Sequence, residues 1–205
     1  VPVLNIDCKL NPANINCEIL SDLKALEPFG AENPQPLFGL YNMEVTAVQP
    51  VSNGKHLRVS VRRNGCTVTG IMFSVTVENF PYAVGDNVDL AVKLSENEYM
   101  GKVKVNIQIK DIKLSGADDD KVLQAHNHYE EFCLGDDALF SEKLNINREF
   151  CGNIYRFLKS NNGWHFSAEM LCHRMGLGED NILNSKIALD VLVDLGLLCY
   201  NDGNY

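Results

Sequence analysis

Alternating hydrophobic and polar residues dominate the middle of the chain. From Lys102 to Lys110, valine and isoleucine alternate with lysine, asparagine and glutamine. The same period of two recurs in four further runs, at residues 41–48, 55–61, 66–73 and 88–94. This period places the apolar side chains of a strand on one face. Five short strands of this kind would leave bare edges in an open sheet, so the pattern predicts closure into a small barrel.

A hydrophobic period near four precedes the barrel. Ile15, Ile19, Leu23 and Leu26 recur at the spacing of one helix face. Pro28 ends the predicted helix, because proline cannot continue the hydrogen-bond ladder. The following residues, up to Pro36, are rich in proline, glycine and asparagine and predict a structured loop.

The period returns to that of helices after a short acidic linker at residues 116–120. Four helices are predicted, at residues 123–134, 148–158, 167–175 and 181–195. Ser167 suits the N-cap of the third helix, and Gly196 suits the end of the fourth. Residues 197–200 predict a strand and residues 201–205 a tight turn. Three helices followed by a hairpin predict a winged-helix-like domain, so the fold class is α+β with a mostly β first half.

The charge distribution divides the chain into three parts. The net charge of the 205 residues is −9, which by itself argues against nucleic-acid binding. Residues 1–38 carry −3, residues 39–115 carry +2 and residues 116–205 carry −8. Such asymmetry indicates separate modules with separate partners, and only the barrel segment suits a polyanion.

Cysteine usage and hydropathy restrict the cellular setting. The seven cysteines are odd in number and include no Cys-x-x-Cys pair. This argues against a disulfide framework or a zinc ribbon and favours reduced thiols in a cytoplasmic protein. No apolar run reaches the roughly 20 residues of a membrane-spanning helix, so no membrane partner is expected. The chain starts at Val1 without a secretory signal, and we expect it to be part of a longer protein.

Motifs for hydrolysis or group transfer do not stand out. The sequence has no Gly-x-Ser-x-Gly, no phosphate loop and no His-Glu-x-x-His. A zinc site at His126, His128 and Cys133 is disfavoured, because a helix would place the two histidines on different sides. Asp118–Asp120 is interpreted as a solvated linker rather than a cation site. Trp164 is interpreted as closing a small core rather than as an exposed interaction anchor.

Basic and hydrogen-bonding residues line the polar sides and ends of the predicted strands. These residues are Lys55, His56, Arg58, Arg62, Arg63, Lys102, Lys104 and Gln108. Lysine and arginine neutralise phosphates, and the rings of Tyr99 and His56 are candidates for stacking on bases. The alternative, given equal weight on spacing alone, is that alternating lysines keep an edge strand soluble.

Three motifs in the same order resemble the bacterial RecJ exonucleases. Residues 26–38 read LEPFGAENPQPLF, which is similar to the family's L-E-P-F-G-x-x-N-P-x-P-x-F stretch. Residues 54–58 read GKHLR and resemble its G-K-H-L-[KR] strand. Residues 97–101 read NEYMG and, with the strand that follows, resemble its N-x-[WY]-x-G and closing-strand pattern. The likeness covers residues 6–114.

The resemblance carries expectations for fold and function. RecJ proteins are 5′-to-3′ single-strand-specific DNA exonucleases of recombination and repair that require Mn²⁺ or Mg²⁺. They combine a DHH catalytic core, a DHHA1 domain and an OB-fold. The resemblance implies that residues 1–38 are the tail of the DHHA1 region with a connecting loop. It implies that residues 39–115 are an OB-fold nucleic-acid-binding barrel, and that residues 116–205 are an acidic linker with the winged-helix-like C-terminal domain.

The resemblance also implies partners and site residues. The partners are single-stranded DNA, the upstream DHH/DHHA1 core and a protein partner of the acidic C-terminal domain. The strand-holding role falls on seven residues, which are Lys55, His56, Arg58, Asn97, Tyr99, Lys102 and Gln108. Arg62 and Lys104 complete the predicted nucleic-acid-binding set.

The chain departs from the family pattern where the chemistry resides. No Asp-His-His triplet and no Gly-Gly-His signature of the DHHA1 domain occur in it. No catalytic residue, metal ligand or cofactor is therefore assigned to this chain, and it is not expected to cut DNA alone. The alternative function is a non-catalytic interaction scaffold, whose barrel packs on the core without touching DNA.

Overall fold

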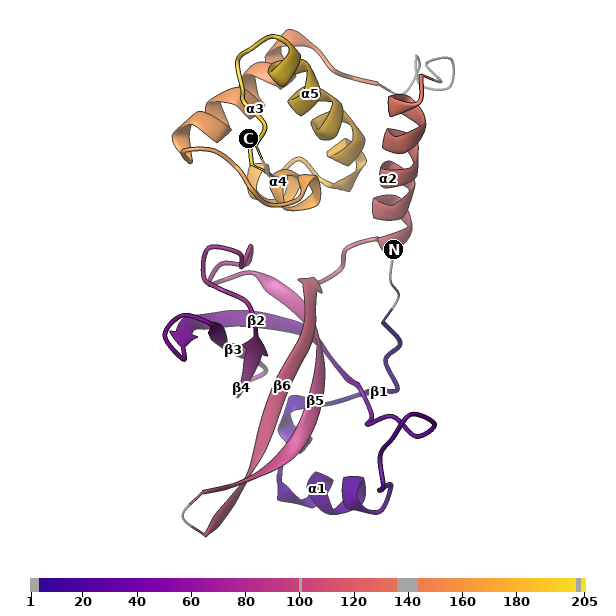
Figure 1. Cartoon of the computed structure of the whole chain (residues 1–205), viewed down its shortest axis with the longest axis vertical. Coiled ribbons are helices and arrows are strands. Elements are labelled where there is room, and N and C mark those ends of the chain that lie inside the picture. Colours follow the sequence, from indigo (N-terminus) through magenta and orange to yellow (C-terminus); the bar gives the residue numbers. More distant parts are fainter. Residues whose placement is uncertain (1–3, 100, 136–143, 202–203) are drawn as a thin grey trace. The chain divides into compact units, whose positions relative to one another are not determined.

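Five long strands close into a barrel in the first half of the chain (Figure 1). They are β2 (Phe38–Val51), β3 (His56–Arg63), β4 (Cys66–Phe73), β5 (Asn87–Tyr99) and β6 (Lys102–Leu114). Their order is β2-β3-β4-β6-β5, and β5 pairs back onto β2. Neighbouring strands are antiparallel except β4 and β6, which run parallel. This is an OB-like arrangement and confirms the predicted five-stranded barrel.

The computed structural model describes residues 4–99, 101–135, 144–201 and 204–205. The chain divides into two compact units, Val1–Gly116 and Ala117–Tyr205. None of the described helices is long and apolar enough to cross a membrane.

Inward-facing residues of all five strands form the barrel core. Leu40, Met43, Leu57 and Val59 have no exposed surface. Gly70 on β4 faces the same interior, and a Cβ atom there would lie 2.8 Å from Cγ1 of Ile109 on β6. Glycine at this position therefore lets β4 and β6 approach closely enough to close the barrel.

The residues before the barrel share its core. β1 (Cys8–Lys9) pairs in parallel with the start of β2, and the short helix η1 (Pro12–Asn14) follows. α1 (Cys17–Lys24) is capped by the Asn16 side chain, and Leu23 is buried in the barrel's hydrophobic cluster. The segment interpreted as the tail of a preceding region thus packs on the barrel and belongs to the same unit.

A side-chain amide organises the loop between α1 and β2. Asn33 Nδ2 donates hydrogen bonds to the carbonyl oxygens of Leu26 and Pro28, at 2.8 and 3.0 Å. Gln35 Nε2 donates to the carbonyl oxygen of Leu94 on β5, at 2.7 Å. These bonds hold the proline-rich loop in one conformation against the barrel.

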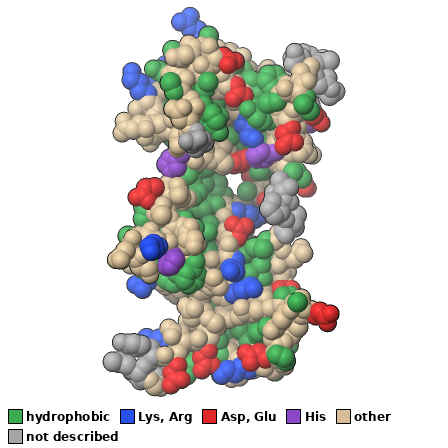
Figure 2. All heavy atoms as spheres, viewed as in Figure 1, with side chains coloured by type: hydrophobic (Ala, Val, Ile, Leu, Met, Phe, Trp, Pro, Cys, Tyr) green, Lys and Arg blue, Asp and Glu red, His purple; other side chains and the backbone are tan. Residues whose placement is uncertain are grey.

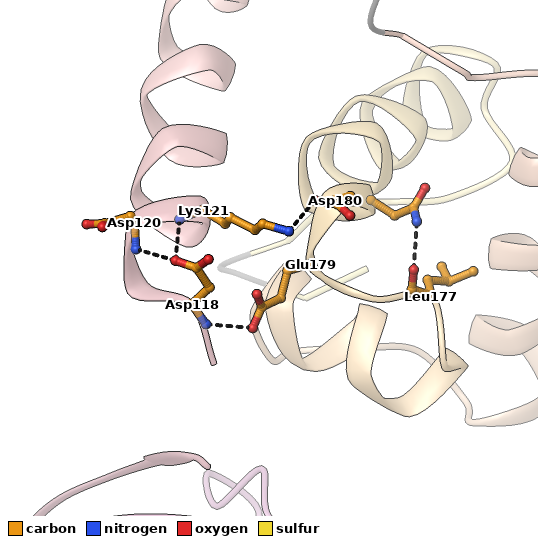
Figure 3. Close-up of polar contacts among 7 residues, drawn as sticks. Asp118, Asp120, Lys121, Leu177, Glu179 and Asp180 are labelled. Carbon is orange, nitrogen blue, oxygen red and sulfur yellow. Dashed lines mark hydrogen bonds and ion pairs between the residues drawn. The ribbon is translucent and has the colours of Figure 1, made fainter. Parts of the chain in front are cut away.

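Helices make up the second unit. They are α2 (Asp119–Cys133), α3 (Arg148–Ser160), α4 (Ala168–Met175), η3 (Glu179–Asn181) and α5 (Ile182–Asp194). α2 begins four residues earlier than predicted, because Oδ1 of Asp118 accepts hydrogen bonds from the backbone N–H groups of Asp120 and Lys121, both at 3.2 Å. The interpretation of Asp118–Asp120 as a linker is therefore wrong, since Asp118 is a helix N-cap and the next two residues begin α2, although all three residues are exposed to solvent as predicted (Figure 3).

Polar contacts attach α2 to the rest of its unit. Near its start, the backbone N–H of Asp118 donates to Oε1 of Glu179 at 3.0 Å, and Nζ of Lys121 lies 2.9 Å from Oδ1 of Asp180 (Figure 3). Farther along, the His126 ring lies between Glu169 on α4 and Lys186 on α5. The described residues contain no group of three or more His, Cys, Asp or Glu side chains suited to a metal ion.

Aromatic side chains pack between α3 and α4. Trp164 is buried, and its ring makes edge contacts with the rings of Phe157 and Phe166. The interpretation of Trp164 as a core residue is confirmed. The backbones of Trp164 and Tyr205 form two hydrogen bonds, at 2.9 and 2.8 Å, so the last residue lies beside the turn after α3.

The predicted strand at residues 197–200 is wrong. The backbone N–H groups of Leu197 and Leu198 donate to the carbonyl oxygen of Leu192, at 2.9 and 3.1 Å. This chain reversal at Gly196 satisfies the end of α5 and leaves residues 197–200 without strand geometry. Asn201 and Asn204 form an isolated bridge beyond it.

Tyr82, in the segment between β4 and β5, makes the stability of the barrel depend on pH in the alkaline range. Its hydroxyl donates to the carbonyl oxygen of Ile112 at 2.7 Å, and burial, with added repulsion from Asp111 and Asp86, raises its pKa to about 12. The pKa in the unfolded chain is about 10. The contribution of Tyr82 to stability should thus be complete below pH 10 and be lost as the pH rises to 12 and above.

We expect Tyr82→Phe to lower the free energy of unfolding by about 1 kcal/mol at neutral pH, because the Ile112 carbonyl loses its donor. The variant should also lack the tyrosine that ionises near pH 12 in an ultraviolet titration. Tyr41→Phe is the matched control and should keep that step. An unchanged titration in Tyr82→Phe would contradict the assignment.

Candidate nucleic-acid interface

The outward sides of β3 and β4 carry four cross-strand pairs. The pairs are His56–Phe73, Arg58–Ile71, Ser60–Thr69 and Arg62–Thr67. The residues between them on β3, Leu57, Val59 and Val61, are buried in the core. Strand periodicity therefore directs the four pairs away from the core. The hydroxyls of Ser60 and Thr69 lie 2.9 Å apart, so polar groups link the two strands at the middle of this face.

The same surface continues across β6 onto β5. Ile71 pairs with Gln108 on β6, and Gln108 pairs with Lys93 on β5. Arg58 and Gln108 are thus two strands apart, roughly 10 Å at the usual strand spacing. Towards the tip of the β5–β6 hairpin follow the pairs Ser95–Asn106 and Asn97–Lys104. We call the four β3–β4 pairs together with Lys93, Ser95, Asn97, Lys104, Asn106 and Gln108 the outer face.

Charges of opposite sign lie on opposite sides of the β5–β6 hairpin. Lys93 on β5 and Lys104 on β6 belong to the outer face, whereas Glu96 on β5 pairs with Val105 and has the opposite parity. Glu96 forms an ion pair with Lys24 of α1, behind the outer face. This separation leaves the cations of the hairpin on the side that continues from β3 and β4.

Several outer-face cations are available to an anion. In the described part of the chain, Arg58, Lys93 and Lys104 form no ion pair, and neither does Lys55 in the exposed turn between β2 and β3. Arg62 differs, because its Nη2 lies 3.0 Å from Oε2 of Glu44 on β2. The basic character is therefore concentrated around Arg58 and along the hairpin. Figure 2 shows basic and histidine side chains next to hydrophobic ones over the barrel.

The predicted site residues divide into three groups. Those that the structure places on the outer face are His56, Arg58, Arg62, Asn97, Lys104 and Gln108, with Lys55 in the adjoining turn. The side chains of Tyr99 and Lys102 lie outside the described part, although their backbones pair at the hairpin tip. Arg63 has a structural contact, since its Nη1 donates to the Tyr41 carbonyl oxygen at 2.6 Å.

Phe73 and Lys93 are outer-face residues that sequence reasoning missed. The Phe73 side chain is 47% exposed at the end of β4. It lies against His56, with ring centroids 4.9 Å apart, and Nδ1 of His56 accepts a hydrogen bond from the Ser74 backbone N–H at 3.0 Å. The signal was present in the sequence, because Phe73 has the same strand parity as Thr67 and Thr69, opposite to Val68 and Gly70.

Comparisons with known proteins identify a family for the barrel unit. Residues 6–111 match the RecJ OB domain family. The chain is similar to the single-stranded-DNA-specific exonuclease RecJ of Bacillus subtilis, with 23% identity over 116 residues, 56% of this chain and 15% of the relative. It is also similar to the crystal structures of Thermus thermophilus RecJ with Mg²⁺ and with Mn²⁺. Their identities are 27% and 26%, and their TM-scores are 0.40 and 0.41.

The matched region is a small part of each relative. The two Thermus comparisons cover 53% and 55% of this chain but 16% of each RecJ chain. The likeness is thus confined to about one sixth of the relatives' length and centres on the barrel unit.

Proposed function

The chain belongs to the RecJ OB domain family, and from this we propose that its barrel binds single-stranded DNA on the outer face. OB-fold barrels bind oligonucleotides on the face of their second and third strands and through two flanking loops. In this chain these are β3 and β4, the β2–β3 turn with Lys55, and the tip of the β5–β6 hairpin. The predicted residues of the outer face lie on these elements, except Gln108, which lies farther along β6 beside Ile71 of β4.

The observation that carries the proposal is a set of cations on one side of the barrel that form no ion pair among the described residues. Arg58, Lys93 and Lys104 would each neutralise a phosphate and release counterions, which gives affinity without sequence preference. Gln108 and Asn97 lie among them and offer hydrogen bonds to sugars or bases. The acidic Glu96 lies behind the outer face and is paired with Lys24, so it does not cancel this field.

We further propose that the chain serves a RecJ-type 5′-to-3′ exonuclease of DNA recombination and repair in the cytoplasm. The barrel would hold the strand while a DHH core hydrolyses it. Mn²⁺ or Mg²⁺ would be bound by that core, since the Asp-His-His ligand motif is absent from this sequence. Similarity to the Bacillus subtilis exonuclease supports this role.

For the second unit we propose a winged-helix-like fold that contacts a protein. Three helices, α3 to α5, precede a chain reversal whose end pairs with the backbone of Trp164, as a wing would. Residues 116–205 carry a net charge of −8, whereas DNA interfaces are strongly basic. The charge therefore supports a protein partner rather than DNA.

Salt-dependent binding tests the proposed function of the barrel. We expect the 205-residue chain to bind fluorescein-labelled oligo-dT with an affinity that falls as salt rises from about 50 to about 300 mM. Three or four phosphate contacts predict a slope of log K against log salt of about −2 to −3, at about 0.7 per contact on a single strand. Fluorescence anisotropy measures this directly. No binding at the lowest salt concentration would instead favour the non-catalytic scaffold.

A further inference from the structure

Phe73 is a large exposed aromatic side chain on an otherwise mainly polar surface. It ends β4, and 47% of it remains exposed. The outward residues before it on the same strand include Thr67 and Thr69. Strand parity directs Phe73 away from the core, so the ring cannot be buried without breaking the register. An aromatic side chain left exposed next to basic residues is typical of a binding surface.

The neighbouring histidine is fixed in position. His56 faces Phe73 across the β3–β4 pairing, with the ring planes at 65° and the centroids 4.9 Å apart. The backbone N–H of Ser74 donates to Nδ1 of His56 at 3.0 Å, which sets the orientation of the imidazole ring. The two rings form an edge-to-face pair that exists before any ligand binds. Little side-chain entropy would then be lost when a flat ligand stacks on it.

Cations lie on both sides of this ring pair along the chain. Lys55 directly precedes His56, and Arg58 follows it two residues later on the same face of β3. Neither forms an ion pair in the described part of the chain. The site therefore combines an aromatic surface with positive charge at its edges, which suits a flat ring attached to phosphates.

We infer that Phe73 and His56 form a stacking site for one unpaired nucleobase at the β3–β4 end of the outer face. Lys55 and Arg58 contact the flanking phosphates. This inference rests on the proposed single-strand binding and assigns it a base-binding position. Stacking needs only the face of a base, so the site accepts every base. It excludes a base within a duplex, because both faces of that base are covered by its neighbours.

Replacement of Phe73 by leucine tests the inference in the full 205-residue chain. Leucine keeps an apolar side chain but removes the aromatic face. We expect Phe73→Leu to bind oligo-dT about 5- to 150-fold more weakly than the parent chain, while Phe73→Trp binds as well or better. The salt slope should stay unchanged in both variants, because no phosphate contact is lost. Val84→Ala, at a 64% exposed apolar residue between β4 and β5 that is not part of the outer face, is the matched control and should not alter binding.

A strand with abasic sites separates stacking from a structural effect. The parent chain should prefer oligo-dT over an abasic strand of equal length, and Phe73→Leu should lose most of that preference. Equal binding of both strands by the parent chain would overturn the inference, as would full affinity in Phe73→Leu. Either result leaves the proposed function standing as long as binding remains salt-dependent. Absence of any binding by the parent chain would reject the proposed function instead.

Discussion

Replacing Lys55, Arg58 and Lys104 by alanine together is expected to weaken oligo-dT binding about 100-fold at about 0.1 M salt. The three residues span the outer face and its adjoining turn and form no ion pairs in the described part of the chain. Loss of three phosphate contacts lowers the salt slope by about 2, since each contact on a single strand contributes about 0.7. Extrapolated from about 1 M to about 0.1 M salt, a slope change of about 2 corresponds to a factor of about 100. Anisotropy titrations at four salt concentrations measure both quantities.

A charge-matched control makes this result specific. Lys9→Ala, Lys121→Ala and Lys159→Ala together also remove three positive charges, but none of these residues belongs to the outer face. Lys9 lies over the Tyr41 ring, Lys121 pairs with Asp180, and Lys159 lies in the last turn of α3. We expect this variant to bind almost as well as the parent chain. An equal loss in both triple variants would show that only net charge matters and would contradict the assigned surface.

Gly163→Ala is expected to destabilise the second unit by about 3 kcal/mol. Gly163 has φ +106°, which L-residues rarely adopt, and a Cβ atom there would lie 2.7 Å from the backbone oxygen of Tyr205. That oxygen accepts the hydrogen bond from the Trp164 N–H, so the clash would also break the backbone pairing that holds the end of the chain. Backbone strain of this kind amounts to about 1–3 kcal/mol before the lost hydrogen bonds are added.

The single tryptophan provides the measurement. Trp164 is the only tryptophan of the chain and lies in the second unit, so its fluorescence follows unfolding of that unit alone. Gly196→Ala is the control, because Gly196 also has positive φ, +68°, but no atom lies within 4 Å of an added Cβ. We expect a loss of only about 1 kcal/mol there. Oligo-dT binding should survive in both variants, and comparable losses of stability would refute the steric argument.

The barrel was predictable because its strands alternate strictly. Leu57, Val59 and Val61 face inward as a period of two requires, and a closed sheet is the arrangement that buries five such faces. The far end of β5 was predicted less completely: the alternating pattern ends at residue 94, whereas β5 runs to Tyr99, because Glu96 occupies an inward parity position beyond the core. Beyond the core, β5 continues into the β5–β6 hairpin. On the side of this hairpin opposite the outer face, Glu96 forms an ion pair with Lys24.

The candidate site was predictable in its residues but not in its charges. Strand parity placed Arg58, Lys104 and Gln108 on the outward sides of their strands, and the observed strand order brings these sides onto one surface. Whether a cation is neutralised depends on cross-strand register, and the pairing of Glu44 with Arg62 follows from the alignment of β2 with β3. Phe73 was missed because the predicted site was defined by basic and hydrogen-bonding side chains together with the rings of Tyr99 and His56. The strand parity of Phe73, rather than its hydrophobicity, indicates that its side chain lies on the outer face.

Local capping explains the errors in the second unit. Asp118 satisfies the start of α2 through its side chain, so an acidic run that suggested a linker became the first turn of a helix. At the other end, Leu197 and Leu198 bond back to Leu192, which removes their N–H groups from any strand ladder. Both outcomes depend on competition for a few backbone hydrogen bonds, and hydrophobic periodicity does not report on that competition.

The strand pairing of the barrel is shortest where β4 and β6 run parallel. β4 and β6 are joined by two residue pairs, Ile71–Gln108 and Met72–Ile109, whereas the antiparallel neighbours share long ladders. Transient opening of the cylinder should therefore begin at the β4–β6 pairing. A polynucleotide bound as proposed, from Arg58 across Ile71 to Gln108, would contact the strands on both sides of the β4–β6 pairing. Binding would then oppose the opening of the barrel and make it more rigid.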